Sequence, residues 1–178
     1  MAMTIAELTA SVRSVPNFPK PGIVFRDITT LLKDSRSLKA VNEILVNRYR
    51  ESKIDTVVGI ESRGFIFGAS LALDLGAGFV PIRKKGKLPA ETIREEYALE
   101  YGTDTIEIHK DAISKGDRVL LHDDLLATGG TIGAAMKLVE RLGGTIVETA
   151  FLIELTFLNG RRNLPGRDIF SIIKVEKE

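Results

Sequence analysis

The chain has 178 residues, about the length of one domain, and 44% of its residues are hydrophobic. Its formal net charge of +1 gives no general reason to expect nucleic acid or an anionic membrane as a partner. The chain has no cysteine, which excludes disulfides and a zinc site built on cysteine. No apolar run approaches 18 residues, and no cationic, apolar signal segment opens the chain. We therefore expect a single domain, residues 1–178, that acts in the cytoplasm.

Residues 3–14 are predicted to form a short amphipathic helix. Ile5, Leu8 and Val12 fall at helical spacing, and Thr4 with Glu7 matches a capping box. The chain then changes character, because Pro16, Pro19 and Pro21 follow within six positions. Prolines at this density exclude a regular helix or a central strand, so an irregular, stiffened segment is expected.

This proline-rich segment is too apolar for a solvated loop, since it carries Phe18 and a run of apolar residues that ends at Phe25. From composition alone, the favoured interpretation is a hydrophobic flap that packs on the core.

A strand–loop–helix unit comes next. Residues 38–49 are predicted to be a helix, and residues 55–60 a buried strand. The strand ends in a polar loop, and a second helix then runs to Gly76. The loop is either an ordinary turn with Glu61 as a helix cap, or an anion site. In the second interpretation the N–H groups of Ser62, Arg63 and Gly64 face an anion and the guanidinium completes the clamp.

Residues 78–83 are a further predicted strand, after which the composition becomes basic and polar. A turn that contains Lys84, Lys85 and Lys87 leads into two predicted strands of an exposed hairpin, residues 95–101 and 105–108. From the charges alone, such a hairpin is expected to be a solvated edge of the sheet that its charges keep soluble.

The most informative stretch is VLLHDDLLATGGT, residues 119–131. Its apolar start predicts a buried parallel strand, and Asp123 and Asp124 are expected where that strand ends. The glycine-containing turn that follows opens a helix, and free N–H groups and the helix dipole there favour a phosphate monoester. Adjacent acids are also common in loops and helix caps. If functional, they suit ribose hydroxyls, a hydrated magnesium ion or a developing positive charge.

The remaining chain completes the pattern. A helix at residues 131–142, a strand at 145–155, a loop at 157–167 and a closing strand at 169–175 are predicted. His109 and His122 are expected to be hydrogen-bonded scaffold groups. Alternating strands and helices with polar loops at strand ends predict an α/β fold, a parallel sheet flanked by helices with its ligands at the carboxyl edge.

Residues 119–131 closely resemble the 5-phosphoribosyl-1-pyrophosphate (PRPP) signature of the type I phosphoribosyltransferases. The stretch fits neither a Walker nor a GxGxxG pattern. FPKPGIVFRDITTLL resembles the N-terminal hood of the adenine-specific members, and RKKGKLP and LEYG resemble their mobile catalytic loop. The likeness covers essentially the whole chain. It implies a hood at about residues 1–34 and a flexible loop at about residues 83–109.

The resemblance also implies roles for individual residues. Asp123 and Asp124 would hold the ribose and, through water, magnesium, and Glu100 would exchange a proton with the base. A strained cis peptide is implied at Glu61–Ser62. The 5′-phosphate would lie on the turn formed by Ala127, Thr128, Gly129, Gly130 and Thr131. Pyrophosphate would meet Glu61, Ser62, Arg63, Arg83, Lys84, Lys87 and Tyr101. The base would stack on Phe25 and meet Val24, Arg26 and Leu155.

The expected activity is purine salvage in which adenine and PRPP give AMP and pyrophosphate with Mg²⁺, carried out by a homodimer. Two alternatives remain open. One is an enzyme for another purine, such as xanthine. The other is a PRPP-sensing regulator, which is disfavoured because only about 15 residues precede the proline-rich segment, too few for a DNA-binding module.

Overall fold

The computed structural model describes residues 3–98 and 102–177. Its centre is a seven-stranded mixed sheet in which β4, β3, β7, β8 and β9 run parallel, and β6 and β5 extend one edge in antiparallel pairing. In spatial order the strands are β5 (Thr92–Ala98), β6 (Thr103–His109), β4 (Gly78–Lys84), β3 (Thr56–Ile60), β7 (Arg118–Leu126), β8 (Thr145–Leu155) and β9 (Ile169–Val175).

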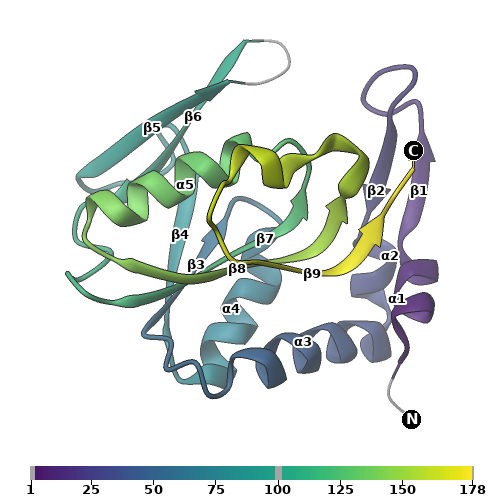
Figure 1. Cartoon of the computed structure of the whole chain (residues 1–178), viewed down its shortest axis with the longest axis horizontal. Coiled ribbons are helices and arrows are strands. Elements are labelled where there is room, and N and C mark those ends of the chain that lie inside the picture. Colours follow the sequence, from purple (N-terminus) through teal and green to yellow (C-terminus); the bar gives the residue numbers. More distant parts are fainter. Residues whose placement is uncertain (1–2, 99–101, 178) are drawn as a thin grey trace.

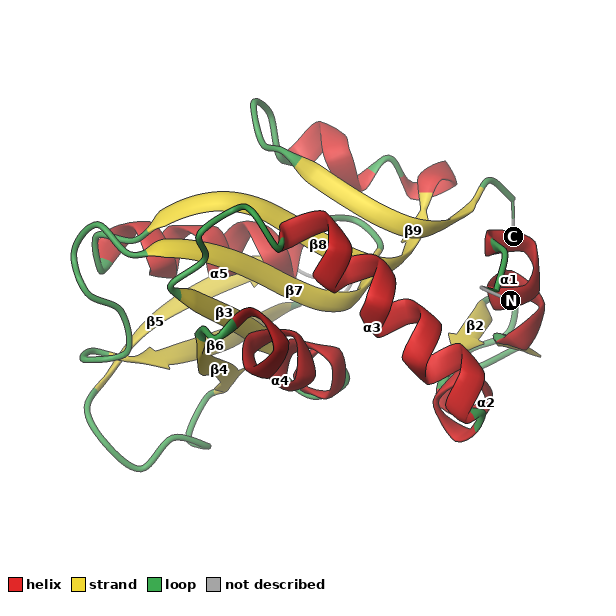
Figure 2. Cartoon of the chain, turned by 90° about the horizontal axis from the view of Figure 1, so that it is seen from below, coloured by secondary structure: helices red, strands yellow, loops and turns green. Residues whose placement is uncertain are grey.

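Helices cover both faces of this sheet. One face packs on α3 (Ser35–Tyr49) and α4 (Gly64–Leu75), and the other packs on α5 (Gly130–Arg141). Figure 2 views the sheet from the α3 and α4 side. Successive strand residues alternate between the two cores, as Leu120 and Leu121 do. This double burial explains why the central strands are continuous apolar runs, and it confirms the predicted α/β architecture.

The N-terminal hood is more regular than predicted. Helix α1 (Ile5–Ser11) carries the expected capping box, but it ends before Val12. The chain then forms a separate antiparallel ribbon of β1 (Arg13–Pro16) and β2 (Val24–Asp27), followed by α2 (Thr29–Lys33). The expectation of an irregular segment was therefore wrong for both strands. Pro16 is tolerated because a two-stranded ribbon consists only of edge strands.

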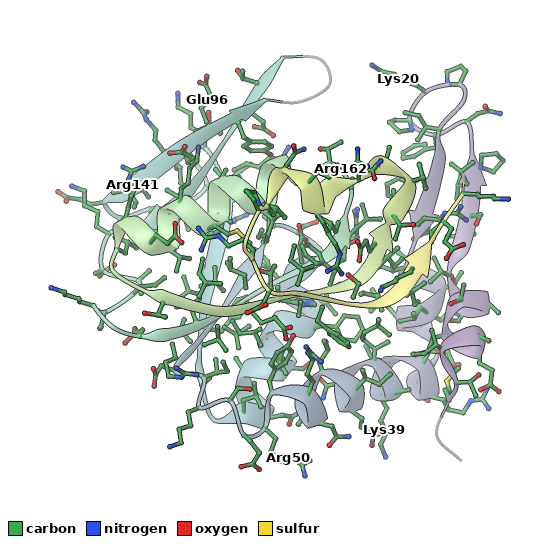
Figure 3. All side chains as sticks on the ribbon, in the orientation of Figure 1. Lys20, Lys39, Arg50, Glu96, Arg141 and Arg162 are labelled. Atoms are coloured by element: carbon green, nitrogen blue, oxygen red, sulfur yellow. The ribbon has the colours of Figure 1, made fainter. Side chains whose placement is uncertain are left out.

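The hairpin of β5 and β6 is less exposed than predicted. Ile106 and Ile108 of β6 are buried in the core beneath α5. Lys137 and Arg141 of α5 both reach Glu95 of β5, and the Arg141 side chain also bonds the Arg94 carbonyl. Figure 3 labels Arg141 near the end of α5, beside the hairpin. The hairpin is thus anchored along its base, while it and the hood project to the same side of the molecule (Figure 1).

The segment after β8 was predicted to be a loop, but it contains two short 3₁₀ helices, η1 (Thr156–Leu158) and η2 (Gly160–Asn163). Helix α5 begins one residue earlier than predicted, at Gly130, and β8 and β9 match their predicted bounds. Among the described residues, no helix is long and apolar enough to cross a membrane.

Candidate active site

Two adjoining hollows lie at the carboxyl edge of the sheet, between the hood and the hairpin. The smaller, about 160 Å³, is lined by the turn at residues 127–131 and by neighbouring side chains. The larger, about 510 Å³, lies between the loop after β3, the base of the hairpin and the end of β7. Asp123, Leu125 and Thr131 line both hollows, so the two form one continuous site.

The paired acids lie inside β7, because that strand continues to Leu126 and was predicted to end before them. Pairing with β3 stops at His122, whereas pairing with β8 runs on to Leu126. Beyond His122, the edge of β7 next to β8 is therefore still hydrogen-bonded, while the edge next to β3 is free to face the site. Both Asp123 and Asp124 line the larger hollow.

Asp124 connects the sheet to the hood. Its carboxylate accepts a hydrogen bond from Nε of Arg63 at 2.5 Å, and the Arg63 guanidinium lies 5.3 Å from the centre of the Phe25 ring. The Nη groups of Arg63 have no hydrogen bond to a described residue. Arg63 can therefore stay paired with Asp124 and still donate to an anion.

Asp123 lies in an environment that resists negative charge. Burial, followed by the neighbouring Asp124 charge, raises the pKa of the Asp123 carboxyl well above its usual range. Its Oδ1 accepts the Asp124 backbone N–H at 2.9 Å, which partly offsets that cost. Perturbed acids in a cleft are typical of functional sites.

The loop after β3 and the end of β4 form one wall of the larger hollow. The Glu61–Ser62 peptide is cis, as the family likeness implied. The Glu61 carboxylate bonds the end of β4. It accepts two bonds from Arg83, at 2.9 and 3.2 Å, and one from the Lys84 backbone N–H. The Arg83 hydrogen bonds hold the pKa of the Glu61 carboxyl below its usual range. Glu61 and Arg83 thus brace this wall.

Lys84 reaches the larger hollow together with two residues that sequence reasoning missed. Its ammonium pairs with Asp104 at 3.0 Å, and the Tyr97 hydroxyl donates to Asp104 at 3.3 Å. The hydroxyl of Thr131 lies beside that of Tyr97. Tyr97 and Asp104 are on hairpin strands that looked solvent-exposed in the sequence, so only their pairing in the fold reveals them.

Two predicted pyrophosphate residues, Arg83 and Lys87, do not line the larger hollow. Lys87 is not among the lining residues, and its backbone carbonyl accepts from Arg83 at 3.1 Å. Its charge acts at a distance by helping to lower the pKa of Glu61. Glu100 and Tyr101 lie outside the described residues.

The turn at residues 127–131 has the form expected of a phosphate site. Gly129 is in the left-handed region at φ +87° and caps α5 without a side-chain hydrogen bond. The first backbone N–H groups of the helix therefore face the smaller hollow unpaired within the helix. Such N–H groups and the positive end of the helix dipole stabilise a bound phosphate.

The residues predicted to hold a base lie near this site but not in its two hollows. Phe25 meets the site through the Arg63 guanidinium, and its ring also packs edge-on against Phe18. The Arg26 side chain is bonded within the hood, to Ser14 Oγ at 2.5 Å. Val24 is half-buried in β2, and Leu155 packs at the end of β8.

The histidines differ from each other. His109 accepts a bond from the Ala90 N–H at 3.4 Å, as a scaffold group would. His122 is fully buried against Phe67, and neither ring nitrogen has a well-formed hydrogen bond to a described residue. Burial lowers the pKa of His122 to about 4. The expectation of a hydrogen-bonded His122 was therefore wrong, and it is a neutral core residue.

Metal binding at this site would depend on the substrate. Among the described residues, no three His, Asp or Glu side chains gather as a metal site would require. Two adjacent carboxylates do fit Mg²⁺, which retains water and is commonly held by one or two carboxylates and substrate phosphates.

The match to a known family agrees with this geometry. Residues 27–175 match the phosphoribosyl transferase domain. An adenine phosphoribosyltransferase of Solibacter usitatus is 58% identical over 171 residues, covering 96% of this chain and 99% of that protein. The chain therefore belongs to the phosphoribosyltransferases and, within them, to the adenine phosphoribosyltransferase family.

Solved structures support the same placement. The adenine phosphoribosyltransferase of Thermoanaerobacter pseudethanolicus superposes with a TM-score of 0.94 at 55% identity, covering 97% of this chain and 100% of that one. The enzyme from Saccharomyces cerevisiae, solved with an imino-altritol bisphosphate and adenine, superposes with a TM-score of 0.89 at 43% identity, covering 94% and 97%.

Proposed function

We propose that the chain transfers the phosphoribosyl group of PRPP to adenine, giving AMP and pyrophosphate. The observation that carries the proposal is the continuous site at the sheet edge. There a helix N-terminus suited to phosphate and a larger hollow, whose lining includes Arg63 and Lys84, meet at Asp123. PRPP has the matching form, a ribose with a phosphate at one end and a pyrophosphate at the other.

In this proposal the smaller hollow holds the 5′-phosphate on the backbone of residues 127–131, with Thr128 and Thr131 adding hydroxyl donors. The larger hollow holds pyrophosphate, which meets the N–H groups of the Ser62 loop, Arg63 and Lys84. Glu61 and Arg83 shape that wall, and Lys87 and Tyr101 join when the hairpin closes. This is the flexible loop proposed for about residues 83–109.

The chemistry follows from the charge at the ribose. The bond from C1′ to pyrophosphate oxygen breaks first, so pyrophosphate leaves with the electron pair and C1′ becomes cationic. Adenine N9 then bonds to C1′, and its proton passes to a base, for which Glu100 is the proposed acceptor. Asp123 and Asp124 hold the ribose hydroxyls and offset the positive charge, which exists only near the transition state.

Magnesium would be held by Asp123 and Asp124 through water and by the substrate. Its chemistry when bound is to neutralise charge on the pyrophosphate. The adenine ring would stack on Phe25, beside backbone groups of Val24 and Arg26, with Leu155 as the far wall. Backbone groups suit this task because a neutral base needs fixed donors and acceptors more than it needs charge.

The proposal also covers assembly and compartment. PRPP is multiply charged and does not cross membranes unaided, and we propose that the enzyme acts on it in the cytoplasm. A homodimer is proposed because α4 carries two exposed apolar side chains one above the other, Ile66 at 42% and Leu73 at 81%.

A competition assay tests the proposed reaction. Adenine, hypoxanthine, guanine and xanthine would compete in one reaction with PRPP and Mg²⁺, with each nucleotide quantified by chromatography. We expect AMP as the dominant product. Dominant formation of xanthosine or guanosine monophosphate would replace adenine as the substrate, and no nucleotide from any base would favour a PRPP-binding protein without transferase activity.

A further inference from the structure

The phosphate turn is held from outside by a segment that lies about 30 residues further along the chain. Residues 160–164, which include η2, pack their backbone directly on the turn. A Cβ atom on Gly129 would lie 2.7 Å from the Gly160 carbonyl oxygen, and one on Gly160 would lie 2.2 Å from the Ala127 carbonyl oxygen. Real Cβ atoms essentially never approach so closely. The contact therefore requires glycine on both sides.

A side chain of the same segment bonds the turn itself. Nδ2 of Asn163 donates to the Thr128 carbonyl oxygen at 2.8 Å. This bond fixes the orientation of the peptide that links Thr128 to Gly129. That peptide contributes the N–H of Gly129, which lies at the entrance to the helix N-terminus. Leu164 is buried beside the start of α5, so it secures the end of the segment.

The segment is anchored firmly enough to act as a support. Arg161 makes two bonds to the buried Glu154 carboxylate of β8, at 2.7 and 2.8 Å, and a third to the Ile169 carbonyl at 3.1 Å. Ser171 of β9 donates to the same carboxylate at 2.7 Å. The segment is thus tied to the last two strands of the sheet, and the turn rests against a fixed body.

We infer that Gly160 and Asn163 are positioning residues for the 5′-phosphate: they set the shape of the turn at residues 127–131 without touching the ligand. The inference rests on the proposed function, because it takes that turn as the phosphate subsite. The inference predicts different effects at two subsites of the active site, the one for the 5′-phosphate and the one for pyrophosphate. Loss of the support should weaken ligands that carry the 5′-phosphate and leave pyrophosphate binding unchanged, since no residue of the segment lines the larger hollow that contains Arg63 and Lys84.

The test measures three affinities by calorimetry, for AMP, ribose 5-phosphate and pyrophosphate with Mg²⁺. Asn163→Ala deletes the bond to the turn, and Asn163 is exposed, so folding does not depend on it. Gly160→Ala pushes a methyl group into the Ala127 carbonyl. Thr156→Val is the matched control, because Thr156 Oγ1 also bonds a backbone carbonyl, that of Val175 at 3.0 Å, but from the neighbouring η1 and away from the turn.

We expect Asn163→Ala to weaken AMP and ribose 5-phosphate about five-fold, as the loss of one hydrogen bond implies. Gly160→Ala should weaken both about ten-fold or more through overpacking. Pyrophosphate affinity should stay at the wild-type value in both variants, and Thr156→Val should change none of the three.

Other results would overturn the inference. Phosphate affinities of Asn163→Ala that match those of Thr156→Val would show that the segment only packs. An equal loss for pyrophosphate would indicate general disruption, with thermal unfolding as the check. If Gly160→Ala does not fold, the exposed Asn163→Ala decides alone. A wild-type protein that binds pyrophosphate but neither phosphate ligand would instead remove the turn from the site, and the proposed function with it.

Discussion

At the scale of single residues, the site contains one carboxyl group, that of Asp123, whose burial disfavours its charged form. Asp123 has a raised pKa because it is desolvated and lies beside Asp124. A carboxyl group whose folded-state pKa is raised costs stability progressively as the pH rises from its unfolded pKa through its folded pKa. Ionising Asp123 in the folded enzyme therefore comes at the expense of stability, which is common where a charge serves catalysis.

Asp123→Asn removes the charge, so it should lower turnover and raise stability. Turnover should fall by about 100-fold, the size typical of losing one electrostatic contribution to a transition state. The melting temperature at pH 7 should rise, by about 2–4 °C for each kcal/mol recovered. The rise should vanish below pH 3.8, where the wild-type carboxyl group is protonated folded and unfolded. Single-turnover kinetics and thermal melts at several pH values would measure the two effects.

The exposed Asp111→Asn serves as the control for Asp123→Asn and should change neither quantity. A loss of AMP affinity as large as the loss of turnover would mean that Asp123 binds the ground state and does not act selectively on the transition state.

Phe25 offers a second test at this scale. If its ring stacks on the base, Phe25→Ala should raise the KM for adenine by the equivalent of about 1–3 kcal/mol, with a much smaller change in the KM for PRPP. Steady-state kinetics with each substrate varied in turn would show the split. Equal changes for both substrates would mean that Phe25 only supports Arg63, over which its ring lies.

At the scale of elements, the network at the end of β8 should make stability depend on pH in the opposite sense. The Arg161 hydrogen bonds, and then the one from Ser171, lower the pKa of the Glu154 carboxyl. A lowered folded pKa gives stability that is present above the unfolded pKa and is lost as the pH falls through the folded one.

Glu154→Gln should therefore destabilise the protein at pH 7 by about 1 kcal/mol, a modest value because Arg161 is partly open to solvent. The difference from wild type should close as the pH falls below 4.5. Urea unfolding at several pH values measures it. Glu140→Gln removes a pair with Arg167 that is half exposed on both sides, and it should have little effect at any pH. Equal, pH-independent losses in both variants would contradict the ionic role of Glu154.

The elements themselves were predictable where burial dominates. The runs at residues 145–155 and 169–175 are apolar because both faces of the sheet are covered, so the sequence marks their bounds. The hood ribbon was missed because its pairing joins Val15 to Phe25 across a proline-rich turn, and a short edge ribbon leaves no periodic pattern. The hairpin was predicted to be exposed because its many charged residues outweighed the signal for burial from Ile106 and Ile108.

The site was predictable only where one segment carries it. Residues 127–131 form a contiguous turn, and Arg63 does line the hollow. Contacts between distant positions leave no trace in a single sequence. The Asp124–Arg63 pair spans 61 positions, and Asn163 reaches Thr128 across 35. The pairing of Glu61 with Arg83 was hidden for the same reason, because the two residues lie 22 positions apart.

At the scale of the whole molecule, α4 tests the proposed assembly. Leu73 is 81% exposed, so Leu73→Asp removes no core packing. If two chains meet through this helix, the substitution should yield monomers in analytical ultracentrifugation while the wild type sediments as a dimer. Ile5→Asp, at an exposed position on α1, should leave the dimer intact. A dimeric Leu73→Asp chain would move the interface elsewhere, and a monomeric wild type would end the proposal of a homodimer.

The glycine-to-glycine contact between the phosphate turn and η2 has a consequence for protein engineering. Grafting the sequence ATGGT onto another strand–helix unit would transfer the hydroxyl groups and glycines, but not the segment at residues 160–164 that sets the shape of the turn. In this chain the carbonyls of Ala127 and Gly160 occupy the space that a side chain on the opposite segment would need. The smallest transplantable phosphate site is therefore two segments, residues 127–131 and 160–164, carried on strands whose spacing brings them into backbone contact. Randomised libraries at positions 129 and 160 should return glycine at both, whichever is varied first.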